Sequence, residues 1–278
     1  MNVQALRKFR RTLAEGRLAL GLWVTLEAPS LTDAAVALGV DWVVVDAEHG
    51  HLDWKEIHEH VRAAVRSETV VLVRLAERST ALAKRALDIG ADGVVIPWVE
   101  TVNQFEEALR DCRYPPEGRR GIGGERATVW GQCLAEHTAE ANENVLVVPL
   151  IETARAIEAL PALCQVEGAE VFYIGPADFS ASRGFRGQWE GPGVVQQILA
   201  LKDTIRAAGK SCGVLTRNRE DLLNRQAQGF QMLGLGSDIG LMLRALRESL
   251  QSVGRDRQPV TSLEARDSKS LPATPPPR

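Results

Sequence analysis

Apolar, β-branched runs alternate with amphipathic segments along almost the whole chain. Helix-period stretches such as TALAKRALDIG and VNQFEEALRDC separate the runs, and several of them end on Gly, as helix C-caps often do. The runs are continuously apolar, which is typical of parallel strands buried on both faces. About eight such β-α units in one domain predict a (β/α)8 TIM barrel. The candidate strands cover residues 18–26, 42–47, 70–75, 93–98, 145–152, 171–175, 211–216 and 231–236.

An open, doubly wound sheet is the alternative fold for this pattern. It is disfavoured because the repeats are evenly spaced and no G-x-G-x-x-G follows the first strand. A length of 278 residues fits one large α/β domain or two small ones. We predict a single barrel domain with an N-terminal helix over 1–253. The remaining residues, 254–278, are polar and Pro-rich, and this composition predicts a flexible tail.

Composition excludes several classes of partner. The net charge of -3 and the lack of a basic cluster argue against nucleic acid. No window approaches the roughly 20 apolar residues of a membrane span, and the N-terminal segment lacks the apolar region of a secretion signal. The cysteines are scattered without a Cys-x-x-Cys pair, which indicates free thiols in a reducing cytoplasm. They are Cys112, Cys133, Cys164 and Cys212.

Charged residues collect where the predicted strands end. In a TIM barrel the C-terminal ends of the strands form the active-site face. Strand interiors are otherwise nearly free of charge, so these residues are candidates for chemistry. The candidates are Asp46, Glu48, His49, Arg74, Glu152, Asp178 and Asp238, together with the uncharged Trp23.

Two of these acids, Glu152 and Asp178, follow adjacent strands. Mg²⁺ is often held by one or two carboxylates, with water and substrate oxygens completing the octahedron. No His or Cys accompanies them at ligand spacing, so a zinc site is not expected. Alternatively, each acid pairs with an Arg or caps a following helix.

His49, Arg74 and the GPAD turn at 175–178 extend this set. A carboxylate beside His49 can hold one tautomer and tune its basicity, although a histidine there can also be a plain polar residue. Arg74 either pairs with a strand-end acid or faces an anionic ligand. The N–H groups of Ala177 and Asp178 can meet a small carboxylate. The set fits an α-keto acid chelated to a divalent metal, whose enolate the metal and Arg74 stabilise.

Five motifs in order resemble the class II pyruvate aldolases: GLW at 21–23, DAEHG at 46–50, YPPEGRRGIGG at 114–124, IET at 151–153 and GPADFSAS at 175–182. This is the 4-hydroxy-2-oxoheptanedioate, 2-keto-3-deoxy-L-rhamnonate and 5-keto-4-deoxy-glucarate aldolase family, and the resemblance spans about 16–253. It implies a barrel of the phosphoenolpyruvate/pyruvate class, assembled as a homohexamer with the last helix exchanged between partners. It also implies reversible cleavage of a 4-hydroxy-2-oxo acid to pyruvate and an aldehyde, in aromatic or sugar-acid catabolism.

The resemblance also implies residue roles. His49 would be the acid/base, oriented by Asp46 and assisted by Asp88 from a neighbouring position. Arg74 would hold the keto oxygen, and Glu152 and Asp178 would bind Mg²⁺, Mn²⁺ or Co²⁺. No lysine sits at a strand end, so we expect no Schiff base. Expected substrate contacts are Trp23, Arg74, Gly123, Gly124, Arg126, Gly175, Pro176, Ala177 and Asp178.

The sequence departs from this family on the acceptor side. Leu150 stands where the best-known members have Gln, and Gly124 where they tend to have Ser, so the aldehyde stays unidentified. A long insertion, 113–144, follows the fourth predicted helix, and we expect it on the strand-end side. Arg126 would then meet an acidic or hydroxylated tail of the aldehyde; alternatively, it pairs with Glu125 or with another subunit.

Three alternative functions have less support in the sequence. A citrate-lyase-β or malyl-CoA-type lyase needs a basic surface for CoA, which the sequence does not show. A non-catalytic keto-acid-binding barrel would be expected to lose His49 or Arg74, and both are present. A phosphate loop at LGLGSD, 233–238, competes with a simple turn and N-cap at Ser237 or Asp238, which we prefer.

Overall fold

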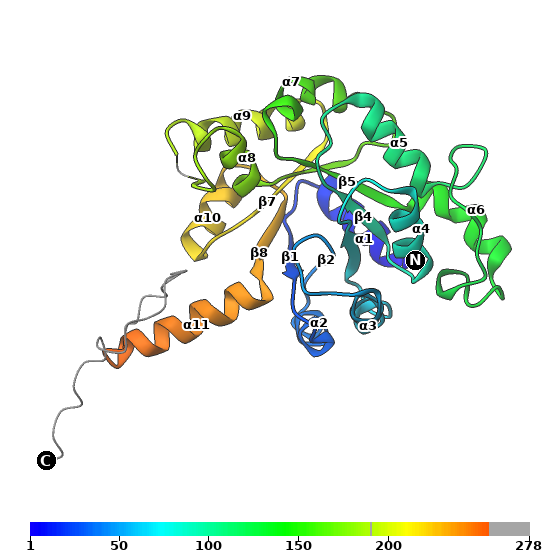
Figure 1. The fold of residues 1–278 in the computed structure, drawn as a ribbon, viewed down its shortest axis with the longest axis horizontal. Helices are drawn as coiled ribbons and strands as arrows, with labels where there is room; N and C mark the ends of the chain where they lie inside the picture. The colour runs from blue at the N-terminus through cyan, green and yellow to red at the C-terminus, as the bar shows by residue number, and fades with distance from the viewer. Residues whose placement is uncertain (190, 256–278) are drawn as a thin grey trace, which may run out of the picture. The chain divides into compact units, whose positions relative to one another are not determined.

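The computed structural model describes residues 1–189 and 191–255. Eight parallel strands close into a barrel in chain order, and the last strand pairs with the first (Figure 1). The closed sheet confirms the (β/α)8 fold and excludes the open sheet, and every predicted strand is present with ends within two residues of those expected. The strands are β1 (Ala19–Val24), β2 (Trp42–Asp46), β3 (Val70–Arg74), β4 (Gly93–Ile96), β5 (Leu146–Ile151), β6 (Val171–Ile174), β7 (Ser211–Leu215) and β8 (Met232–Ser237).

Helices follow the strands, and the predicted N-terminal helix is present. Part of the 113–144 insertion is itself structured, as the 3₁₀ helix η1 (Arg126–Thr128) and the helix α6 (Leu134–Asn144). The other helices are α1 (Val3–Ala14), α2 (Pro29–Ala37), α3 (Trp54–Ala64), α4 (Thr80–Asp88), α5 (Val102–Cys112), α7 (Ala154–Leu163), α8 (Pro176–Ser182), α9 (Val194–Ala207), α10 (Arg219–Ala227) and α11 (Asp238–Ser252).

The barrel belongs to a compact unit, Met1–Leu241, and a second unit begins at Met242 within α11. Residues 256–278 of the predicted tail lie outside the described residues. In the part of the chain that the structure describes, no helix has the length and apolar character to cross a membrane.

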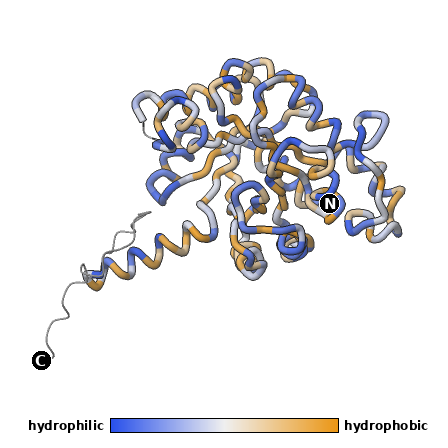
Figure 2. Tube along the Cα trace, in the orientation of Figure 1, coloured by the Kyte–Doolittle hydropathy of each residue, from blue (hydrophilic) through white to orange (hydrophobic). Residues whose placement is uncertain are grey.

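Alternation along the strands places side chains on the two faces of the barrel wall. In β2, Trp42 and Val44 point into the barrel interior, where they pack with residues of α1. Val43 and Val45 belong instead to the layer between the strands and the outer helices. Both faces are therefore apolar, as the predominantly apolar colour of the strands in Figure 2 shows. This explains why the strand sequences lack polar alternation.

The cysteines offer a direct test of this packing. Cys112, Cys164 and Cys212 are buried, and Cys133 is exposed. Burial raises the pKa of the Cys164 thiol to about 11 and that of Cys112 to about 12, which removes the reactive thiolate at neutral pH. We expect iodoacetamide to alkylate only Cys133 in the native protein, as counted by intact mass.

All four thiols should react after denaturation in urea. Cys133→Ser should abolish native labelling. Rapid labelling of a second cysteine in the native protein would contradict the packing.

Candidate active site

A cavity of about 180 Å³ lies at the C-terminal ends of the strands. It brings together most of the residues expected from the sequence, because the ends of parallel strands meet on one face of the barrel. Six lining residues come from the strands themselves, and they include Leu150, Tyr173, Ile174 and Leu215. The remaining lining residues are Trp23, His49, Arg74, Glu152, Gly175, Pro176, Ala177, Asp178 and Trp189.

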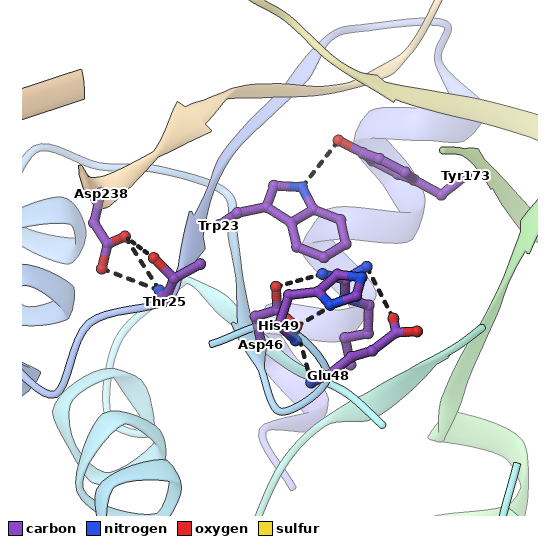
Figure 3. A network of polar contacts seen from close by, with 8 residues as sticks. Trp23, Thr25, Asp46, Glu48, His49, Tyr173 and Asp238 are labelled. Carbon is purple, nitrogen blue, oxygen red and sulfur yellow. Dashed lines mark hydrogen bonds and ion pairs between the residues drawn. The ribbon is translucent and has the colours of Figure 1, made fainter. Parts of the chain in front are cut away.

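Arg74 contacts three of the residues that Figure 3 labels, Asp46, Glu48 and Trp23. It is directly opposite Asp46 in the register of β2 and β3. Its Nε donates to Asp46 Oδ1 at 2.8 Å, and its Nη2 donates to Asp46 Oδ2. Its Nη1 lies 3.0 Å from Glu48 Oε2, and its guanidinium carbon lies 4.8 Å from the centre of the Trp23 ring. Arg74 therefore both pairs with strand-end acids and lines the cavity.

Charge holds Arg74 in its ionised form. Burial alone would lower the pKa of Arg74, but the hydrogen bonds and charge of Asp46, together with Glu48 and Glu152, raise it above its ordinary value. Burial raises the pKa of Glu48, which the Arg74 charge opposes. The cluster therefore combines one cation, Arg74, with two carboxyl groups, those of Asp46 and Glu48.

Asp46 also shapes the turn that carries His49. Its Oδ1 accepts hydrogen bonds from the backbone N–H groups of Glu48 at 3.0 Å and His49 at 3.2 Å. Gly50 completes the turn, and a Cβ there would lie 2.2 Å from the Asp46 carbonyl oxygen. Asp46 thus orients His49 through its backbone, and the exposed imidazole lines the cavity.

Glu152 follows β5 and is almost completely buried. Its Oε1 accepts a hydrogen bond from the backbone N–H of Trp98 at 2.8 Å, and Trp98 has a left-handed backbone with φ 53°. Burial, with the nearby charges of Asp178 and Glu48, raises the pKa of Glu152 to about 7. The helix-capping role is filled by Thr153, whose side chain accepts from the Ala156 N–H at the start of α7.

The donor set at Glu152 and Asp178 fits a hard divalent cation. Both acids line the cavity, and their mutual repulsion and burial are costs that a bound cation relieves. The described residues contain no group of three or more His, Cys, Asp or Glu side chains that is arranged to hold a metal ion. A cation here would therefore need water or substrate oxygens as further ligands, which is the habit of Mg²⁺.

Asp238 lies apart from the cavity and closes the barrel seam. Its carboxylate accepts hydrogen bonds from the Thr25 N–H at 3.1 Å, the Leu26 N–H at 3.0 Å and the Thr25 hydroxyl at 2.8 Å (Figure 3). Ser237 accepts from the N–H of Gly240. This turn and its caps agree with our preference over a phosphate loop.

Besides Asp46, whose contacts are described above, four expected site residues do not line the cavity of their own chain. Asp88, at the end of α4, accepts from Arg120 Nη2 at 2.9 Å, and Arg126 Nη1 donates to the Ile89 carbonyl at 3.3 Å. Asp88 and Arg126 line a different cavity, of about 700 Å³. A Cβ on Gly123 would lie 3.5 Å from the Asp88 carboxylate, and Gly124 lies against Gly131.

The sequence analysis expected the insertion 113–144 on the side of the strand ends, and this expectation is wrong for Gly123, Gly124 and Arg126. A segment that follows a barrel helix leads to the start of the next strand, at the opposite end from the active-site face. Gly123, Gly124 and Arg126 belong to such a segment, and Asp88 ends the helix α4.

Sequence reasoning missed several residues of the cavity. The Tyr173 hydroxyl accepts a hydrogen bond from Trp23 Nε1 at 3.1 Å (Figure 3), and burial raises the pKa of Tyr173. Tyr173 and Leu215 lie near the ends of their strands, so strand alternation carried a signal for them. Trp189 lies in the connection between α8 and α9. The only sequence signal for it was an aromatic residue within a Gly-rich segment.

Comparisons with known proteins find similar proteins along most of the chain. The 4-hydroxy-2-oxovalerate aldolase of Rhodococcus jostii is 36% identical over 86% of this chain and 93% of its own. The 2-keto-3-deoxy-L-rhamnonate aldolase of Salmonella gallinarum is 34% identical over 90% of this chain and 94% of its own. A crystal structure of an HpcH/HpaI aldolase/citrate lyase family protein from Burkholderia cenocepacia has a TM-score of 0.84 and 29% identity, and covers 89% of this chain and 99% of that chain. The family model for HpcH/HpaI aldolase/citrate lyase matches residues 19–245, so the chain belongs to the HpcH/HpaI aldolase/citrate lyase family.

Proposed function

We propose that the protein is a divalent-metal-dependent class II aldolase that reversibly cleaves a 4-hydroxy-2-oxo acid to pyruvate and an aldehyde. The observation that carries the proposal is the shared cavity of His49, Arg74, Glu152 and Asp178 at the strand ends. The curated relatives named above are aldolases, and the substrates in their names are 2-oxo acids.

The pyruvate half of the substrate sits between the charged groups. Glu152 and Asp178 would hold Mg²⁺, Mn²⁺ or Co²⁺, which when bound supplies Lewis-acid stabilisation of charge on the keto oxygen. Arg74 donates a hydrogen bond to the same oxygen as negative charge develops there. The N–H groups of Ala177 and Asp178, in the first turn of α8, face the carboxylate, since first-turn donors have no partner within their helix.

His49 moves the proton of the reaction. In cleavage it takes the proton from the 4-hydroxyl group while the C3–C4 bond breaks and its electron pair forms the pyruvate enolate. The aldehyde leaves, a proton from solvent adds at C3 to complete the methyl group of pyruvate, and His49 releases its own proton to solvent. In the reverse direction His49 returns its proton to the new hydroxyl oxygen.

We further propose a homo-oligomer, a hexamer by the family resemblance. Asp88 and Arg126 line a separate cavity, and Gly123 and Gly124 are not among the residues that line the cavity of His49. These four residues can therefore meet substrate only from a second copy of the chain. The assisting role of Asp88 belongs to this assembly. Light scattering of the purified protein measures the molar mass of the assembly and therefore the number of subunits.

The metal proposal predicts loss and recovery of activity. EDTA should abolish pyruvate formation from a 4-hydroxy-2-oxo acid, and Mg²⁺, Mn²⁺ or Co²⁺ should restore it, because both proposed ligands are hard oxygens. Pyruvate release is followed with a coupled assay, and EDTA pre-saturated with Ca²⁺ serves as the control for chelation.

Borohydride added with pyruvate should leave the intact mass unchanged. A covalent lysine adduct would contradict a metal-dependent mechanism, and so would full activity after dialysis against chelator.

A further inference from the structure

The Glu152 carboxylate lies between the main chain that follows the two neighbouring strands, β4 and β6. On one side, the backbone N–H of Trp98 donates the hydrogen bond to Glu152 Oε1 at 2.8 Å. On the other side lies Gly175, directly after β6, where a Cβ would lie 2.8 Å from Glu152 Oε2 and 3.1 Å from the Glu152 Cβ. One carboxylate oxygen is therefore occupied by an amide, and the other lies close to the turn that carries Asp178.

The donating N–H belongs to a strained turn. Trp98 has a left-handed backbone, which residues with a side chain rarely adopt and which costs free energy. Its indole is 51% exposed, so packing of the side chain within the chain does not account for this conformation. Strained backbone persists where the surrounding structure fixes it, and it gathers at functional sites.

The chain on either side of Trp98 fixes the turn. Ile96 and Val99 are buried in the layer between the strands and the outer helices. Glu100 Oε1 accepts a hydrogen bond from the Thr153 hydroxyl at 2.9 Å, and Thr153 directly follows Glu152. The turn after β4 is thus fastened to the same segment as the carboxylate that it holds.

We propose that Trp98 and Gly175 are positioning residues that fix Glu152 for the divalent cation. The inference rests on the proposed function and deepens it, since it concerns the cation site of that function. The N–H holds one oxygen and keeps the carboxylate from turning to the nearby charge of Arg74, and the missing side chain of Gly175 leaves room for the other oxygen. Groups that hydrogen-bond a metal ligand and orient it contribute about 10- to 100-fold to metal affinity.

Two variants of Trp98 separate its backbone from its indole. Trp98→Gly and Trp98→Val both remove the indole and any contact that it makes with another subunit. Only glycine adopts φ 53° without strain, and a β-branched residue is an outlier there. The EPR signal of free Mn²⁺ measures binding to the substrate-free protein. The dissociation constant should stay within about threefold of wild type in Trp98→Gly and rise about tenfold or more in Trp98→Val. Equal constants in the two variants would overturn the role of Trp98.

Gly175→Ala tests the other side of the carboxylate. The added Cβ would displace Glu152 Oε2, so the dissociation constant for Mn²⁺ should again rise about tenfold. Because both substitutions act through one carboxylate, Gly175→Ala combined with Trp98→Val should lose less affinity than the product of the two separate losses. Wild-type affinity in Gly175→Ala would overturn the role of Gly175.

Trp130→Val is the matched control for strain. Trp130 also has a left-handed backbone, with φ 52°, but it lies in the insertion and outside the cavity of Glu152. The variant should lower stability in urea, as Trp98→Val does, and leave the dissociation constant for Mn²⁺ unchanged. An equal loss of Mn²⁺ affinity in Trp130→Val would assign the effect to the fold as a whole and overturn the inference.

Binding of Mn²⁺ by the wild-type protein separates this inference from the proposed function. Binding with equal affinity in the wild type, Trp98→Val and Gly175→Ala leaves the metal-dependent aldolase standing and removes only the positioning of Glu152. Absence of Mn²⁺ binding by the wild-type protein overturns both.

Discussion

Arg74→Ala is expected to abolish detectable turnover and to lower the free energy of unfolding by about 3–5 kcal/mol, the usual cost of removing one partner from a buried ion pair. The Arg74 side chain is 10% exposed and that of Asp46 is 3% exposed, so the variant leaves two acids buried beside each other without their cation. Urea denaturation followed by tryptophan fluorescence measures the stability, and methyl-proton exchange of pyruvate measures the chemistry.

The loss of stability in Arg74→Ala should depend on pH in a definite direction. Burial already raises the pKa of Glu48, and loss of the Arg74 charge that opposes this would raise it further above the unfolded value. Protonation would then favour the folded state, so the deficit relative to the wild-type protein should shrink as pH falls toward 5. Arg74→Lys is the control, because it keeps a positive charge but loses the two-point contact with Asp46. It should recover much of the stability and little of the turnover. A deficit of less than about 1 kcal/mol in Arg74→Ala would show that the ion pair is not buried in solution.

His49→Ala is expected to lower kcat by roughly 10²- to 10⁴-fold, the usual contribution of a general acid/base. His49 is exposed, so the variant should unfold at the same urea concentration as the wild type. Binding of Mn²⁺ and pyruvate, measured by calorimetry, should persist because neither depends on the imidazole in the proposed mechanism.

His51→Ala provides the matched control. His51 is also exposed, but it lies outside the cavity two residues further along the chain. Its kcat should stay within twofold of the wild-type value. Turnover of His49→Ala within a few fold of wild type would assign the proton transfer to another group.

The barrel was predictable because each strand carries its own evidence. Runs such as WVVVD and VVLVR are apolar on both faces, and only a sheet covered on both sides buries both. The strand-end residues followed from the same regularity, since parallel strands of known order place Asp46, Arg74 and Glu152 on one face. The pairing of Arg74 with Asp46 also followed, because one of the two alternatives for a strand-end arginine was an ion pair with a strand-end acid.

The insertion was misplaced for a physical reason. Gly123, Gly124 and Arg126 have the composition of a ligand-binding loop, but composition does not say at which end of a helix a loop lies. The direction of the chain does, since a segment after α4 or α5 returns to the start of a strand. Trp189 was missed for a different reason. Its position depends on how an irregular connection folds back over the strand ends, and no periodic pattern encodes that path.

The pairing of β1 with β8, which Asp238 stabilises, has a consequence for synthesis of the chain. β1 pairs with β2 on one edge and with β8 on the other, so the edge that carries Trp23 has no partner until residue 237 has left the ribosome. During most of translation the nascent protein is an open sheet with an apolar edge, which is the kind of intermediate that aggregates and that chaperones bind. Hydrogen bonds from Thr25 and Leu26 to Asp238 join the two ends of this sheet. Ribosome-bound chains that end before residue 232 should therefore be sensitive to protease throughout, and those that expose residue 241 should become resistant as a whole.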